Sequence, residues 1–278
     1  MSTQAEKGRA FRALHERPAA FIIPNPWDVG SARLLAHLGF EALATTSAGH
    51  AFSLGQRDNT IPRDRVMAHL DAIVSATDLP VSADLGNGFG DRPETVAETI
   101  RLAAAAGVVG GSIEDSTGRS EDPLYERERA VERVRAAAEA ARALPVSFMV
   151  TGRAENYLVG QPDLGDTIRR LQSYQEAGAD VLYAPGLTGK DDIAAVVSSV
   201  DRPVNVLMGL RGIRLSLAIL SGLGVKRVSV GSALSRAAFG ALLRAGREMR
   251  EHGTFGFADE AEGYPDLNAL FMPPPSRQ

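Results

Sequence analysis

The chain has 278 residues, of which 44% are hydrophobic and 23% charged, with a net charge of -4 and no cysteine. This length exceeds that of one ordinary domain and is typical of one α/β barrel. The negative balance argues against a nucleic-acid-binding or membrane-binding surface. Without cysteine, disulfides, zinc–thiolate sites and thiolate nucleophiles are excluded.

The N-terminal segment, residues 1–17, is charged and has the pattern of an amphipathic helix. It lacks the apolar stretch of a signal peptide. No apolar run in the chain is long enough to span a bilayer. We therefore expect a cytoplasmic protein.

Short apolar, β-branched runs follow along the whole chain and predict eight strands. They begin at Phe21, Ala42, Val81, Gly111, Val146, Val181, Val204 and Arg227. Most are continuous, which is typical of a parallel sheet covered on both faces. Amphipathic segments between them, such as residues 93–106 and 166–177, predict helices, and Gly107 and Gly178 mark the ends of these two.

The uninterrupted series of β→α units predicts an α/β fold, a single (β/α)8 TIM barrel over residues 1–278. An N-terminal helix precedes the barrel, and residues 255–278 are expected to form a C-terminal arm. A doubly wound open sheet is the alternative. Residues 25–28, Asn-Pro-Trp-Asp, stand where its glycine-rich fingerprint would follow the first strand.

Charged residues end three consecutive predicted strands: Asp84, Glu114 and Arg153. In such barrels the strand ends meet at one mouth, where the chemistry takes place. Two carboxylates there can hold one hard cation such as Mg²⁺; the alternative is that they cap helices or pair with arginine. Arg153 suits bidentate capture of a substrate carboxylate or phosphonate, or it forms a salt bridge that organises the mouth.

His50 is the one histidine expected near this mouth, where it either binds substrate or packs the loop. The other four fall on predicted helices and are expected on the surface. They are His15, His37, His69 and His252.

Several stretches occur in an order and spacing that are specific only when taken together. They are residues 24–28 (Pro-Asn-Pro-Trp-Asp), 45–49 (Thr-Thr-Ser-Ala-Gly), 57–58 (Arg-Asp), 84–90, 111–115 (Gly-Ser-Ile-Glu-Asp) and 151–153 (Thr-Gly-Arg). Through them the chain resembles the phosphoenolpyruvate mutase/isocitrate lyase superfamily, in its mutase-like (carboxyvinyl-carboxyphosphonate phosphorylmutase-like) branch, over nearly its full length.

The resemblance implies a Mg²⁺ cofactor at Asp84 and Glu114, partly through waters, with Glu114 also catalytic. Asp58 matches an acidic residue beside the reacting centre, and Arg153 would hold the far end of the substrate. The substrate carboxylate would lie on the loop that follows the second strand. That loop comprises Thr46, Ser47, Ala48, Gly49 and His50.

The resemblance also implies a last helix exchanged with a neighbouring subunit, in a homodimer or homotetramer. Residues 115–125 would form a gate over the substrate. We expect a small 2-oxo or 2-hydroxy acid as the substrate, and neither nucleic acid nor membrane as a partner.

Two departures from the family pattern narrow the function. Gly86 stands where the family has a second acid, which predicts weaker metal binding. The gate lacks the cysteine of the isocitrate lyases. The prediction is a Mg²⁺-dependent lyase or phosphonomutase-like enzyme that forms or stabilises an enolate by C–C or P–C cleavage or rearrangement. The alternatives are an oxaloacetate-type decarboxylase and a barrel that binds a carboxylate without turnover. The exact substrate and the bond broken stay open.

Overall fold

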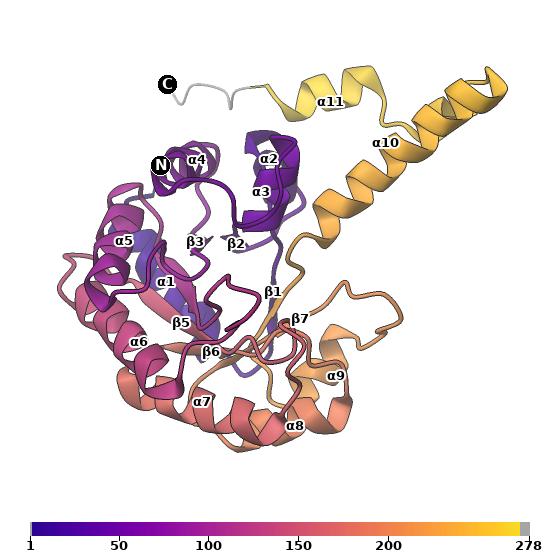
Figure 1. Ribbon diagram of the computed structural model, residues 1–278. Helices are drawn as coiled ribbons and strands as arrows, with labels where there is room; N and C mark the ends of the chain where they lie inside the picture. Colours follow the sequence, from indigo (N-terminus) through magenta and orange to yellow (C-terminus); the bar gives the residue numbers. More distant parts are fainter. Residues whose placement is uncertain (1, 273–278) are drawn as a thin grey trace.

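A computed structural model describes residues 2–272, in which eight parallel strands form one sheet around a central axis (Figure 1). The strands are β1 (Phe21–Ile23), β2 (Leu43–Ala44), β3 (Val81–Asp84), β4 (Gly110–Glu114), β5 (Met149–Arg153), β6 (Val181–Tyr183), β7 (Val204–Leu207) and β8 (Arg227–Ser229). Their order is β1-β8-β7-β6-β5-β4-β3-β2. The remaining gap is bridged where the Ala44 N–H donates to the Pro24 carbonyl, so the barrel is nearly closed.

Helices alternate with the strands. They are α1 (Gln4–Glu16), α2 (Val29–His37), α3 (Ser47–Ser53), α4 (Arg63–Ser75), α5 (Pro93–Ala105), α6 (Arg127–Arg142), α7 (Leu164–Ala177), α8 (Lys190–Ser198), α9 (Leu217–Gly222), α10 (Ala233–His252) and α11 (Tyr264–Leu270), with a short 3-10 helix at Gly256–Glu260. The predicted (β/α)8 TIM barrel is confirmed. Among residues 2–272, no helix combines the length and the apolar character needed to cross a bilayer.

Local signals explain where the helices end. Pro93 occupies the first turn of α5, and Gly107, with φ +90°, follows its last residues. Asp163 caps α7 by accepting from the Asp166 N–H, and Gly178 ends it at φ +105°. Only glycine adopts such left-handed φ values without strain. Both predicted glycine stops are therefore confirmed.

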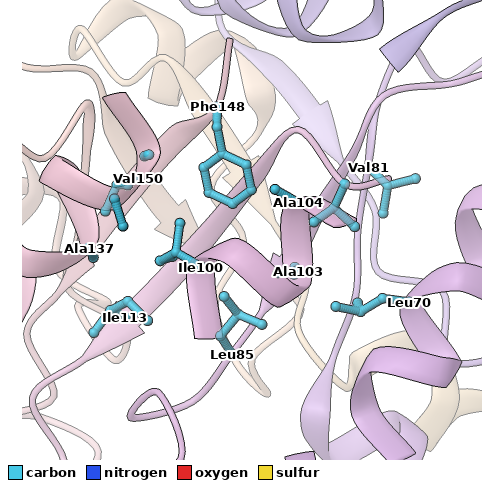
Figure 2. Close-up of a cluster of buried hydrophobic side chains, with 14 of the residues drawn as sticks. Leu70, Val81, Leu85, Ile100, Ala103, Ala104, Ile113, Ala137, Phe148 and Val150 are labelled. Atoms are coloured by element: carbon cyan, nitrogen blue, oxygen red, sulfur yellow. The ribbon is translucent and has the colours of Figure 1, made fainter. Parts of the chain in front are cut away.

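The outward faces of the strands are buried under the helices. Figure 2 shows side chains of the strands and the β3–α5 loop, such as Leu85, Ile113 and Val150, beside Ile100 of α5. All four are at most 1% exposed. Because these positions face the helices, the alternate residues of the same strands face the barrel axis.

Helix α1 covers the end of the barrel where the strands begin (Figure 1). Its Phe11 and Leu14 pack in one apolar cluster with Phe21 of β1 and Val181 of β6. Gly8 allows this close approach, because a Cβ there would lie 2.4 Å from the Ser147 carbonyl oxygen. The opposite end, where the strands finish, is left for the functional groups.

The C-terminal region departs from a simple barrel. Helix α10 leads away from the barrel body, and α11 returns to lie beside α2 (Figure 1). The Arg33 guanidinium donates to the carbonyls of Phe271 and Met272. Within the predicted arm, residues 255–272 thus hold a 3-10 helix and α11, and residues 273–278 lie outside the described part.

Candidate active site at the ends of the strands

Three charged side chains meet where β3, β4 and β5 end. The Arg153 Nη1 atom lies 3.4 Å from Asp84 Oδ1 and 3.2 Å from Glu114 Oε2. Both carboxylates therefore converge on the position of one cationic atom. This is the arrangement that the strand-end pattern predicts.

Arg153 itself is fully engaged with acids. Besides Asp84 and Glu114, it donates through Nε and Nη2 to Glu155, the latter at 3.2 Å. The Arg153 side chain is 15% exposed and Glu155 is nearly buried. The structure thus contains the salt-bridged arrangement that was one of two interpretations of Arg153, and any substrate contact would require this guanidinium to exchange partners.

Burial and mutual repulsion act on the carboxyl groups of the mouth. Burial raises the pKa of Glu114 well above its ordinary value, and the Arg153 guanidinium opposes this shift. Burial, then the neighbouring Asp84 charge, raises the pKa of Asp58. A carboxyl group with a raised pKa retains or accepts a proton more readily near neutral pH, as an acid–base group must.

The loop after β2 is held against the acids. The Ser47 N–H donates to Asp84 Oδ2 at 2.9 Å, and the Gly49 N–H donates to Thr46 Oγ1, which caps α3. Two backbone donors of the predicted carboxylate-binding loop are therefore already bonded within the protein. Ala48 lines a cavity beside them.

Two cavities open at this end of the barrel. The first, which we call the barrel cavity, measures about 180 Å³ and extends inward between the strands; Asp58, Ser47 and Arg153 line its upper part. The second, which we call the gate cavity, measures about 320 Å³ and runs toward α3, α4 and residues 116–118. The cavities share a wall that includes Ser47 and Asp84.

The expectation of surface positions for the histidines is wrong for His15 and His69. His69 of α4 stacks on His50, with ring centroids 3.7 Å apart, and lines the gate cavity with it. Burial lowers the pKa of His69 to about 4 and also lowers the pKa of His50, which favours the uncharged form of both rings. His15 is 3% exposed beneath the barrel, between Phe11 and Phe21. His37 and His252 are exposed, as expected.

The predicted gate, residues 115–125, forms a short hairpin. An antiparallel bridge joins Ser116 to Leu124, and the Tyr125 hydroxyl donates to Asp91. Ser116 and its two successors line the gate cavity. The hairpin is anchored below by Asp115, which is 2% exposed and accepts from Arg170 and the Tyr174 hydroxyl.

The family resemblance implies a metal ion at the mouth of the barrel. Within residues 2–272, no group of three or more His, Cys, Asp or Glu side chains is arranged to hold a metal. Asp84 and Glu114 nonetheless offer two carboxylates that already face one cation. Mg²⁺ commonly takes one or two protein carboxylates and completes its octahedron with water and substrate oxygens, so the pair fits this ion.

Sequence reasoning missed the polar interior of the barrel. The barrel cavity is also lined by Ser82, Ser112, Asn205, Arg227 and Ser229, which come from β3, β4, β7 and β8. The sequence pattern predicts Arg227 only as the first residue of a strand. The signal was present, since Ser82 and Ser112 precede Asp84 and Glu114 by two positions and therefore share their inward face.

Solved structures of known proteins share this fold. A protein of Burkholderia cenocepacia J2315 described as a lyase/mutase is 64% identical, with a TM-score of 0.96, and the match covers 98% of this chain and 97% of that one. Phosphonopyruvate hydrolase in complex with oxalate and Mg²⁺ has a TM-score of 0.84 at 25% identity, covering 97% and 95% of the two chains.

Sequence similarity leads to the same group of enzymes. The 2-methylisocitrate lyase of Escherichia coli K12 is 31% identical over 189 residues, which are 65% of this chain and 62% of that protein. The family described as phosphoenolpyruvate phosphomutase matches residues 11–250. The chain therefore belongs to the phosphoenolpyruvate mutase/isocitrate lyase superfamily of lyases and mutases.

Proposed function

We propose that the protein is a Mg²⁺-dependent lyase or phosphonomutase-like enzyme that generates or stabilises the enolate of a small 2-oxo or 2-hydroxy acid. The observation that carries this proposal is the convergence of Asp84 and Glu114 on one cationic atom at the mouth of the barrel. The presence of oxalate and Mg²⁺ in the related phosphonopyruvate hydrolase supports it, because oxalate has the shape of a small enolate.

Asp84 and Glu114 would hold the cation, because both carboxylates already face the Arg153 Nη1 atom. When bound, Mg²⁺ supplies Lewis-acid stabilisation for negative charge on a substrate oxygen. Arg153, which is bonded to Glu155, would bind a substrate carboxylate or phosphonate, for which its planar donors are suited.

The other residues bind the substrate, move a proton and exclude water. Ser47 and Ala48 line the barrel cavity beside Asp58, whose raised pKa suits proton exchange with the substrate. Thr46, Gly49 and His50 shape the loop above. Closure of the hairpin at residues 115–125 would keep water from the enolate.

A screen with Mg²⁺ tests this function directly. Oxaloacetate, phosphonopyruvate, 2-methylisocitrate and related diacids are incubated with the enzyme, and products are detected by NMR. We expect one of them to be consumed only when Mg²⁺ is present, and not by an Asp84→Asn variant. Binding of Mg²⁺ and oxalate without turnover of any diacid would favour the alternative of a non-catalytic carboxylate-binding barrel. The observation behind this alternative is Gly86, which stands where the family pattern has an acid. Pure loss of CO₂ from oxaloacetate would identify the decarboxylase.

We also propose that α10 is exchanged between subunits of a homodimer or homotetramer, with residues 255–278 as an arm of the barrel domain. Leu242 and Leu243 of α10 are 65% and 56% exposed, and Met249 is 41% exposed. Exposed leucines in a helix that leaves the barrel are typical of an intersubunit contact. Light scattering should give a dimer or tetramer, and Leu242→Glu with Leu243→Glu should shift it toward the monomer; a monomeric wild type would contradict the exchange.

A further inference from the structure

In most (β/α)8 barrels, branched apolar side chains fill the space between the strands. In this barrel, polar side chains line part of that space. Small or polar residues of β3, β4, β7 and β8 surround the lower part of the barrel cavity, among them Ser82, Ser112 and Asn205. Below them lies the apolar cluster of Phe21 and Phe11 that seals the end covered by α1. The cavity therefore ends in a polar floor inside the protein.

Arg227 supplies the charge of that floor. It is 5% exposed, its Nε donates to Asn205 Oδ1 at 2.9 Å, and its Nη2 donates to Thr151 Oγ1 at 3.0 Å. Its third nitrogen, Nη1, is buried and has no hydrogen-bond partner in the described part of the chain. Both acceptors are neutral, and none of the salt bridges within residues 2–272 involves Arg227.

Among the described residues, no charged acidic side chain is paired with this guanidinium. Burial raises the pKa of Tyr183 to about 12, so its phenol is uncharged at neutral pH. Burial, then the Arg227 charge, lowers the pKa of His15 to about 3, so its ring is uncharged as well. Burial lowers the pKa of Arg227 only to about 10, so it remains a cation. A buried charge without a counter-ion is unfavourable, and an anion bound beside it would offset this cost.

From this unmatched cation in a cavity we propose that Arg227 forms an anion subsite inside the barrel, which takes a small carboxylate. Arg227 lines the cavity, and its unpartnered Nη1 would donate to one carboxylate oxygen; Ser82, Ser112 and Ser229 line the same cavity and would supply further donors. The cation of this subsite is Arg227, whereas the proposed metal site uses Asp84 and Glu114. The anion subsite therefore does not depend on the proposed metal site.

The carboxylate has two possible sources, the substrate itself or a free carboxylate that binds beside it. The rival occupant of the space near Nη1 is a water molecule. His15 Nε2 is also buried without a partner, and a water could accept from Arg227 and donate to this nitrogen. The test must separate these cases.

Acetate is the probe, with Mg²⁺ removed by chelation. Its affinity is measured by calorimetry for the wild type, Arg227→Gln, Arg227→Lys and Asp84→Asn. We expect Arg227→Gln to weaken acetate binding by about tenfold or more, as for a charged hydrogen bond. Arg227→Lys should retain part of the binding because it keeps the charge, and Asp84→Asn should bind acetate at least as tightly as the wild type.

A crystal structure of the wild type grown with acetate provides the second readout, which does not depend on how the variants fold. Carboxylate density in contact with Arg227 Nη1 supports the subsite. A single water between Nη1 and His15, with acetate absent and with equal affinities in wild type and Arg227→Gln, overturns it. If acetate competes with oxalate plus Mg²⁺, the subsite serves the substrate's own carboxylate; if both bind together, it serves a free one.

Discussion

Two buried arginines of the same cavity have opposite electrostatic surroundings. Arg153 at the mouth contacts Asp84, Glu114 and Glu155, so three acids surround one cation. Within residues 2–272, Arg227, deeper in the barrel, is bonded only to the neutral side chains of Asn205 and Thr151. The mouth therefore has more carboxyl groups than cations, whereas the interior has a cation without an acidic partner.

The difference indicates what each level can bind. A mouth with more acids than cations gains from a further cation, and an interior with an unmatched cation gains from an anion. A metal ion at the strand ends and a carboxylate beside or below it would neutralise both levels together. The following variants either remove or strengthen one side of this contrast.

The largest effect is expected from Asp84→Asn, which keeps the size of the side chain and removes one of the two converging charges. Metal-dependent turnover should fall by about 10³-fold or more, beyond the loss of a single oxyanion donor. Steady-state kinetics over a Mg²⁺ titration measures this loss. Unchanged turnover at saturating Mg²⁺ would contradict a metal at the mouth.

Asp58→Asn should reduce turnover by about 10²-fold while Mg²⁺ affinity stays nearly the same, because Asp58 is proposed to move a proton rather than hold the ion. The raised pKa of the Asp58 carboxyl gives the sign of the pH effect. If its carboxylate accepts the proton, wild-type activity declines as pH falls through this pKa. That acidic limb should be absent from the profile of the variant; a change confined to Mg²⁺ affinity would contradict the role.

Arg153→Lys keeps the positive charge and loses the bidentate geometry. Substrate affinity should weaken by roughly 1–3 kcal/mol, that is, about 5- to 150-fold. The measurement is the dissociation constant of oxalate in the presence of Mg²⁺. Circular dichroism checks that the variant still folds, because Arg153 contacts three acids. Unchanged oxalate affinity would assign Arg153 to the organisation of the mouth alone.

Gly86→Asp restores the acid that the family pattern contains. Gly86 has φ +52°, which aspartate tolerates better than most residues. A Cβ at this position would have only Asn59 Oδ1 within 4 Å, at 3.8 Å. We expect Mg²⁺ to bind about three- to tenfold more tightly, roughly 1 kcal/mol for one added outer contact. Gly86→Asn is the matched control without charge and should leave the affinity near that of the wild type; equal gains in both variants would exclude a charge effect.

The last effect concerns stability at the barrel end beneath Arg227 and does not involve binding or turnover. The pKa of His15, ordinarily near 6.5, is lowered to about 3 in the folded protein, so the unfolded chain binds the extra proton between these values. Stability should therefore fall as pH decreases from about 6.5, by at most about 1.4 kcal/mol per pH unit from this group. His15→Gln should flatten this slope in urea unfolding, whereas exposed His37→Gln should not. Equal slopes for the wild type, His15→Gln and His37→Gln would show that His15 does not cause this pH dependence of stability.

The sequence was sufficient to locate the mouth because strand-end residues are determined by chain order. Asp84, Glu114 and Arg153 each end a recognisable apolar run, and parallel strands bring such ends together. The family resemblance added Asp58 and the loop of Ser47. Only the three strand-end residues followed from the order of elements alone.

The rest depended on side-chain direction, which the sequence pattern left unresolved. Arg227 begins a strand, and whether it faces the helices or the axis depends on a register that one slip would invert. His15 and His69 lie on polar helices and yet face Phe21 and His50, because α1 lies across the barrel end and α4 packs beside α3. Polar residues two positions apart in several strands were the available sign of a polar interior.

Diffraction from crystals grown with Mg²⁺ and oxalate would show whether the two carboxylates hold a metal ion. We expect an octahedral ion that Asp84 and Glu114 bind directly at about 2.1 Å or through ordered waters. Arg153 Nη1 should have moved from between the two acids toward oxalate. Density for oxalate alone, with Arg153 still bridging the acids at saturating Mg²⁺, would contradict it.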